Sequence, residues 1–230
     1  MRYADISIKL FIFTISLFFM MQFVPMGFAV TSWRESERNG GWQIWISATD
    51  FEEIQGIGTS KTEVKLAEKA TKPWLSEDIL IATDLGGFAD FEFESPVEGA
   101  AYMWGRIADF RGGGQSWFIV LNSLNHAGEG LIFGTPGLAW QWVGNRDVPD
   151  SKSPTDLKKG KNTARIVPRE ARAGVEPLFD VFTISTKPIE PTDADFNAAQ
   201  KRGLAVEPAD KLATTWASIK NNFHGTSVQN

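Results

Sequence analysis

The chain has 230 residues, of which 43% are hydrophobic, so it is long enough for one domain with a substantial apolar core. Its formal net charge is −5 and it shows no basic stripe, which argues against nucleic acid as a partner. It contains no cysteine, which excludes a disulfide framework, a cysteine-based zinc site and a lipid-modified cysteine anchor.

Residues 1–29 predict a secretory signal peptide. Arg2 and Lys9 precede an almost wholly apolar run over residues 10–24, and small residues stand where a signal peptidase reads, so we expect cleavage after Ala29. The mature chain is then secreted or held at the cell surface. An uncleaved membrane anchor is the alternative, although the run is short for a hydrocarbon core about 30 Å thick.

The mature chain predicts many short strands separated by turn signals. Residues 30–41 are polar and predict a flexible segment. Residues 51–60 contain two glycines and predict a loop, and residues 61–70 fit a short helix or a strand, with Val64 and Leu66 favouring a strand. The clearest expected strands cover residues 42–49, 88–94, 100–108, 116–121, 139–143, 163–167 and 178–185.

This succession of strands predicts an all-β fold, with a β-sandwich over residues 42–191. The residue pattern changes in the tail, residues 192–230, which we expect to be partly helical. Residues 193–203 can form a helix, and residues 210–223 carry an amphipathic apolar stripe. The tail is either a helix docked on the sandwich or a separate interaction element.

Several segments resemble carbohydrate-binding modules with the galactose-binding-like β-sandwich, or jelly-roll, fold, such as the modules attached to glycoside hydrolases. The resemblance covers roughly residues 45–191 and implies a non-catalytic module that binds glycan. The matching segments are residues 88–93, 98–107, 116–120, 140–143, 157–166 with Arg169 and Glu170, and 179–184.

The resemblance also bears on metal binding, because many such modules hold a structural calcium ion with two acidic residues in their first strand and one near the C-terminus. Asp180 matches the C-terminal acidic ligand and is our candidate metal ligand. Ser47 and Thr49 stand where the other carboxylates are expected. Calcium takes about six to eight oxygen ligands, so we predict no cofactor and keep calcium at Asp180 as the alternative.

Aromatic side chains are the candidate ligand contacts, since sugars stack their C–H faces on aromatic rings. The aromatic position of the resembled modules maps most nearly onto Trp140 or Trp142, which point the same way on a strand and belong to the core if that face is inward. Trp74, in a polar loop, is the better candidate for an exposed ring. Phe133 and His126 lie in a long loop and are further candidates.

Charged residues complete the candidate site. Arg106, Arg169 and Glu170 can orient a ligand, and the alternative is a structural ion pair at strand ends. Three carboxylates alternate with phenylalanine over residues 88–94, which favours a solvated strand face over a glycosidase pair. We find no nucleophile elbow and no phosphate-binding loop, and predict no enzymatic activity.

The sequence therefore predicts that the partner is a glycan or polysaccharide. The alternative is an extracellular adhesion or assembly module that binds another protein through the amphipathic stretch at residues 210–223. We expect no nucleic acid partner, and contact with a membrane only through the N-terminal segment if it is not cleaved.

Overall fold

The structure is a computed structural model that describes residues 33–36, 38–68, 70, 74–109, 116–134, 139–170 and 176–204. The predicted signal peptide and the amphipathic stretch at residues 210–223 lie outside these residues. Among the helices that are described, none is long and apolar enough to cross a membrane.

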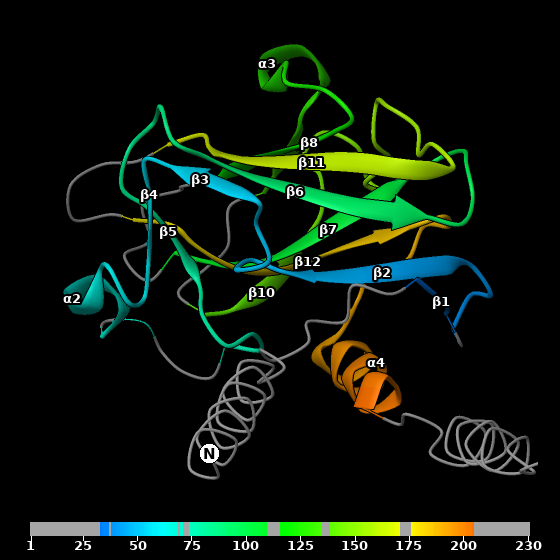
Figure 1. Cartoon of the computed structure of the whole chain (residues 1–230), viewed down its shortest axis with the longest axis horizontal. Coiled ribbons are helices and arrows are strands. Elements are labelled where there is room, and N and C mark those ends of the chain that lie inside the picture. Colours follow the sequence, from blue (N-terminus) through cyan, green and yellow to red (C-terminus); the bar gives the residue numbers. More distant parts are fainter. Residues whose placement is uncertain are drawn as a thin grey trace, which may run out of the picture.

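Two antiparallel sheets pack face to face and form the predicted β-sandwich (Figure 1). In the larger sheet, β12 is central: β7 and then β10 lie on one side of it, while β2 and β5 pair along different parts of its other edge. The sheet comprises β1 (Arg34–Glu35), β2 (Trp42–Ser47), β4 (Ile57–Thr59), β5 (Leu80–Ala82), β7 (Tyr102–Ala108), β10 (Gln141–Val143) and β12 (Leu178–Ser185).

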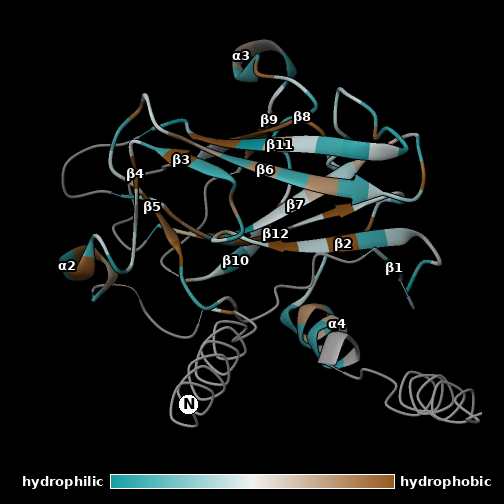
Figure 2. Cartoon of the chain, in the orientation of Figure 1, coloured by the Kyte–Doolittle hydropathy of each residue, from teal (hydrophilic) through white to brown (hydrophobic). Residues whose placement is uncertain are grey.

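The smaller sheet has five strands in the order β3-β6-β11-β8-β9. Alternation along β6 places Ala89, Phe91 and Phe93 in the core and directs the three carboxylates outward, as predicted. Figure 2 shows the same alternation as changes of colour along β6 and β11. The strands are β3 (Glu53–Gln55), β6 (Phe88–Ser95), β8 (Trp117–Leu121), β9 (Leu131–Phe133) and β11 (Gly160–Pro168).

Aromatic rings fill the space between the sheets. Phe91 of the smaller sheet meets Phe182 of the larger one edge to face, with ring centroids 5.1 Å apart, and Trp117 meets Phe179 in the same way at 5.6 Å. Such pairs add stabilisation of about 0.5–1.5 kcal/mol to the burial of their apolar area. The core therefore ties the two sheets together through β12.

Three short helices lie outside the sandwich: α2 (Val64–Ala67), α3 (His126–Glu129) and α4 (Asp193–Leu204). Figure 1 shows α4 against the outer side of the larger sheet and α3 beyond the smaller sheet. The helix predicted at residues 193–203 is thus present as α4. It docks on the sandwich, because Phe196 and Ala199 pack against Trp45 and Val181.

Two predictions for the early part of the chain were wrong. Residues 51–60 do not form a loop but hold β3 and β4, which are edge strands of different sheets, and Gly56 between them has a φ of 62° that lets the chain cross from one sheet to the other. Residues 64–67 form helix α2 rather than a strand, since Ala67 and Leu66 pack on Ile79 and its neighbours while Val64 faces solvent.

We expect Gly105→Ala to destabilise the protein, because Gly105 faces the core in β7. A methyl group there would lie 2.6 Å from Cε2 of Phe133 and 3.0 Å from Cζ of Phe179. Overpacking of this kind costs about 1–3 kcal/mol, measurable by urea unfolding. Gly134→Ala is the matched control, since no atom lies within 4 Å of its added methyl group, and an equal loss in both variants would contradict the packing described here.

Candidate functional site

A buried ion pair organises the outer face of the larger sheet. Arg106 projects outward from β7, and Asp180 lies where the register of β12 shifts between Phe179 and Val181. Nη1 of Arg106 lies 2.6 Å from Oδ2 of Asp180, and the two side chains are 4% and 0% exposed. Removing two charges from water is costly, so such a pair persists only where further hydrogen bonds satisfy both groups.

The Asp180 carboxylate receives those hydrogen bonds from the segment that begins at Trp74. The backbone N–H of Leu75 donates to Oδ2 at 2.7 Å, the N–H of Ser76 donates to Oδ1 at 2.9 Å, and the Ser76 hydroxyl also donates to Oδ1. Asp180 therefore fixes the backbone next to Trp74 on the sheet.

These contacts bear on the predicted metal role of Asp180, because both of its oxygens already accept protein donors and Arg106 supplies the counter-charge. Ser47 and Thr49 bond to each other through their hydroxyls at 3.0 Å. Within the described part of the chain, no three acidic or histidine side chains are grouped so as to hold a metal ion. The geometry thus argues for Asp180 as a structural anchor.

The same guanidinium holds the beginning of α4. Nε and Nη2 of Arg106 donate to the two oxygens of Asp193 at 2.9 and 3.0 Å, and the indole N–H of Trp142 donates to Oδ1 of Asp193 at 2.8 Å. The Asp193 side chain remains 49% exposed. A carboxylate that solvent can reach is therefore placed beside Trp142 and Arg106.

The structure brings together the three tryptophans predicted from the sequence, and we call Trp74, Trp140 and Trp142 the tryptophan cluster. The guanidinium of Arg106 lies 5.3 Å from the ring centroid of Trp140, in a cation–π contact. Trp74 and Trp140 pack on the same apolar group around Ile81 and Leu178. All three rings are half-buried and lie outside the core between the sheets.

Trp142 extends the cluster towards α4. Its ring meets Trp45 edge to face, with centroids 5.4 Å apart, and Trp45 in turn meets Phe196 of α4 at 5.7 Å. Trp45 is buried by these contacts. The sequence reasoning missed both Trp45 and Asp193, and Asp193 reaches this face only through the docking of α4.

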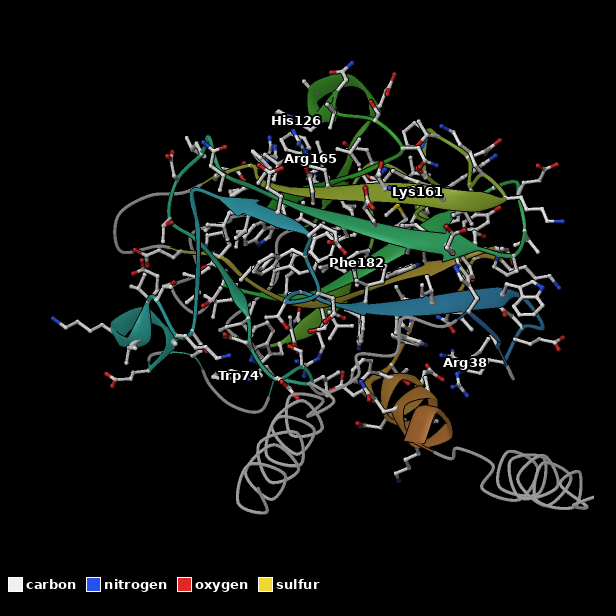
Figure 3. All side chains as sticks on the ribbon, viewed as in Figure 1. Arg38, Trp74, His126, Lys161, Arg165 and Phe182 are labelled. Atoms are coloured by element: carbon white, nitrogen blue, oxygen red, sulfur yellow. The ribbon has the colours of Figure 1, made fainter. Side chains whose placement is uncertain are left out.

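The other predicted ligand contacts do not join the cluster. Phe133 as a ligand contact is wrong, since its ring is 0% exposed and stacks on Phe179 in the core. His126 lies on α3 at the far side of the sandwich, as Figure 3 shows, with its ring 5.3 Å from that of Phe118. Arg169 and Glu170 form an ion pair after β11, and Glu170 accepts hydrogen bonds from Ser116. Of the two alternatives for Arg169 and Glu170, these contacts favour the structural ion pair at the end of a strand.

A second acidic position lies beside the Asp180 segment. Burial raises the pKa of Asp50 from its usual 3.8 to about 6, with the negative charge of Glu77 adding to the shift and a hydrogen bond from the backbone N–H of Ser47 opposing it. Asp50 therefore holds its proton more tightly in the folded protein than in the unfolded chain.

Comparison with known proteins gives matches among solved structures only. No protein-family model and no curated protein matches the chain. The structure is similar to a family 35 carbohydrate-binding module from Clostridium thermocellum, with 14% identity, a TM-score of 0.45, and 62% of this chain and 96% of that chain covered.

Two further matches are of the same kind. A β-1,3-glucan-binding family 6 module from Bacillus halodurans has 16% identity and a TM-score of 0.40, with 60% of this chain and 92% of that one covered. A Podospora anserina β-(1,4)-mannanase with a family 35 module has 19% identity and a TM-score of 0.47, with 70% of this chain and 30% of that one covered.

We expect Arg106→Gln to destabilise the protein by about 3–5 kcal/mol, because it leaves the Asp180 carboxylate buried without a counter-charge. Unfolding in urea at pH 7 measures the change. Arg146→Gln is the matched control, because Arg146 forms its ion pair with Asp147 at the exposed surface. A loss below 1 kcal/mol for Arg106→Gln would contradict the anchoring role of this pair.

Asp50 gives a prediction for pH dependence. Its folded pKa of about 6 lies above the usual 3.8, so its contribution to stability is fully present below pH 4 and is lost as the pH rises to about 6. The shift corresponds to about 1–2 kcal/mol once partial exposure is allowed for. Asp50→Asn should therefore stabilise the protein at pH 7.5 relative to wild type, and this gain should shrink at pH 4.

Urea unfolding at both pH values tests this prediction. Asp147→Asn serves as the control, because Asp147 is exposed. A gain for Asp50→Asn that is equal at pH 4 and pH 7.5 would show that the effect does not come from titration of this carboxyl.

Proposed function

We propose that the mature chain is a secreted, non-catalytic module that binds glycan at the tryptophan cluster. The observation that carries this proposal is the gathering of three half-buried tryptophans, from two segments of the chain, on one face of the larger sheet, with Trp140 and Trp142 next to Arg106 and Asp193. The resemblance of the sequence segments to carbohydrate-binding modules implies the ligand class, and the predicted signal peptide supports secretion.

The chemistry of the cluster suits a sugar. Aromatic faces accept the C–H surfaces of a pyranose ring, and a few fixed polar groups then orient its hydroxyls. Here the partly exposed Asp193 carboxylate is an acceptor for hydroxyl groups, and Arg106 holds it in place. Because the rings are fixed by packing, little side-chain entropy is lost when a ligand binds.

The carboxylates on the smaller sheet support a non-catalytic role. Asp90 accepts two hydrogen bonds from Arg165, both at 2.6 Å, and Glu92 pairs with Lys161 at 2.7 Å. A glycosidase pair needs one carboxyl as a proton donor and another as a base or nucleophile. These two carboxylates are instead neutralised by neighbouring cations across the β6–β11 ladder.

A glycan array with the mature chain from Val30, run with calcium and with chelator, tests the proposal. We expect binding to at least one polysaccharide class, and a loss of about 1–3 kcal/mol in binding free energy when Trp140 or Trp142 is replaced by alanine. Titration calorimetry with the best glycan measures the loss, and circular dichroism confirms that each variant is folded.

Trp42→Ala is the matched control, because Trp42 is 40% exposed but begins β2, outside the cluster. Full affinity in folded Trp74→Ala, Trp140→Ala and Trp142→Ala variants would overturn the site. Absence of binding to every glycan by the folded wild-type chain would overturn the function.

A further inference from the structure

A polar hollow lies on the same face as the tryptophan cluster, between β1, β2 and α4. It has a cavity volume of about 60 Å³ and is partly open to solvent, which suits one small polar group rather than a whole ligand. Figure 3 shows Arg38, at its rim, and Trp74 at opposite ends of this face. The hollow lies beside the tryptophan cluster, since Trp45 in its lining contacts Trp142.

The strand side of the hollow is polar and includes one buried donor without a partner among the described residues. Arg34 faces Gln43 across the β1–β2 ladder, and its Nε is buried without an acceptor among the described residues. Ser36 and Gln43 flank it and are only 8% and 7% exposed. A buried donor left without a partner costs about 1–3 kcal/mol, so native proteins seldom keep one such as the Arg34 Nε–H without a use for it.

Among the described residues that line the hollow, Arg38 pairs with Asp195 and Arg34 forms no ion pair. Oδ2 of Asp195 accepts hydrogen bonds from Nη1 of Arg38 and from the N–H and hydroxyl of Thr192, at 2.5, 2.8 and 2.7 Å. That oxygen of Asp195 is therefore engaged by three donors. Glu35 also lines the hollow but is exposed, and among the described residues it forms no ion pair with Arg34.

The remaining walls of the hollow are apolar and leave room for a ligand group. Ala198 and Ala199 line the hollow from α4, and their small side chains keep the helix from filling it. Trp45 lies at its base and is held by Trp142 and Phe196. The hollow thus has polar residues on its strand side, the apolar ring of Trp45 at its base and small residues on its helix side.

We propose that this hollow binds the carboxylate group of a small ligand. The Arg34 guanidinium is the fixed cation that pairs with the carboxylate, and its planar fork suits two oxygens. The Gln43 amide and the Ser36 hydroxyl donate to oxygens of the same ligand. This inference rests on Arg34 and its neighbours and does not depend on the proposed glycan site.

Nitrogen-15 NMR of the mature chain from Val30 tests the proposal, with the Arg34 Nε–H resonance as the readout. The probes are glucuronate, its neutral counterpart glucose, and succinate, a carboxylate without a sugar frame. We expect glucuronate or succinate to shift this resonance in a saturable way, and glucose to leave it unchanged. A response to glucuronate alone would show that the ligand is a sugar acid, whereas a response to both would show that the carboxylate suffices.

Variants connect the response to the hollow. Arg34→Gln should weaken carboxylate binding at least tenfold, and Gln43→Leu should weaken it as well, with binding then followed through the Trp45 indole resonance. Arg146→Gln removes the same charge from an exposed loop and should leave the affinity unchanged. Equal responses to glucose and glucuronate, no response to either carboxylate, or full affinity in folded Arg34→Gln and Gln43→Leu variants would each overturn the proposal.

Discussion

The arrangement of the larger sheet's outer face depends on one buried ion pair, Arg106 with Asp180. The pair is enclosed because the neighbours of each partner complete its hydrogen bonds: Leu75 and Ser76 on the carboxylate, Asp193 on the guanidinium. Each of these neighbours begins a segment that would otherwise lack a fixed position on the sheet. The hydrogen bonds that offset the cost of removing both charges from water also fix the positions of a loop, a helix and a tryptophan ring.

The ion pair also separates two kinds of apolar contact on that face. On one side, Trp74 and Trp140 pack on the group around Ile81; on the other, Trp142 and Trp45 pack beneath α4. An apolar side chain at position 106 could cover the sheet equally well but would leave Asp180 unpaired and α4 without its first anchor. The charge is therefore what joins these two clusters into a single surface.

The regular strands could be predicted from the sequence because their signal is local. Alternation over residues 88–94 and the apolar run at 178–185 each define a buried face without reference to any partner. The strands β3 and β4 carry no such signal, because each has only three residues and lies next to Gly56. They form strands only because β6 and β5 offer free edges for pairing. The choice between helix and strand for residues 64–67 could not be made for the same reason, since the burial of α2 depends on Ile79 and Leu178.

The site was predictable in its members but not in its arrangement. The resemblance to carbohydrate-binding modules pointed to Trp140 and Trp142, and a polar loop pointed to Trp74, yet nothing local shows that these rings meet around positions 106 and 193. Phe133 was misjudged because a short apolar stretch within a long loop can be either an exposed contact or an edge strand facing inward. Its pairing with Trp117 decides for the second.

The ladder between β2 and β12 has a mechanical consequence. These strands are antiparallel, and the pair Gln43–Ser185 lies at the end where β2 begins and β12 leads on to α4. Tension between the two ends of the folded part would therefore peel the ladder open one pair at a time from that end, rather than shear all its hydrogen bonds at once. The contact of Arg38 with Asp195 bridges the two pulled segments directly, so it would bear the load before any strand separates.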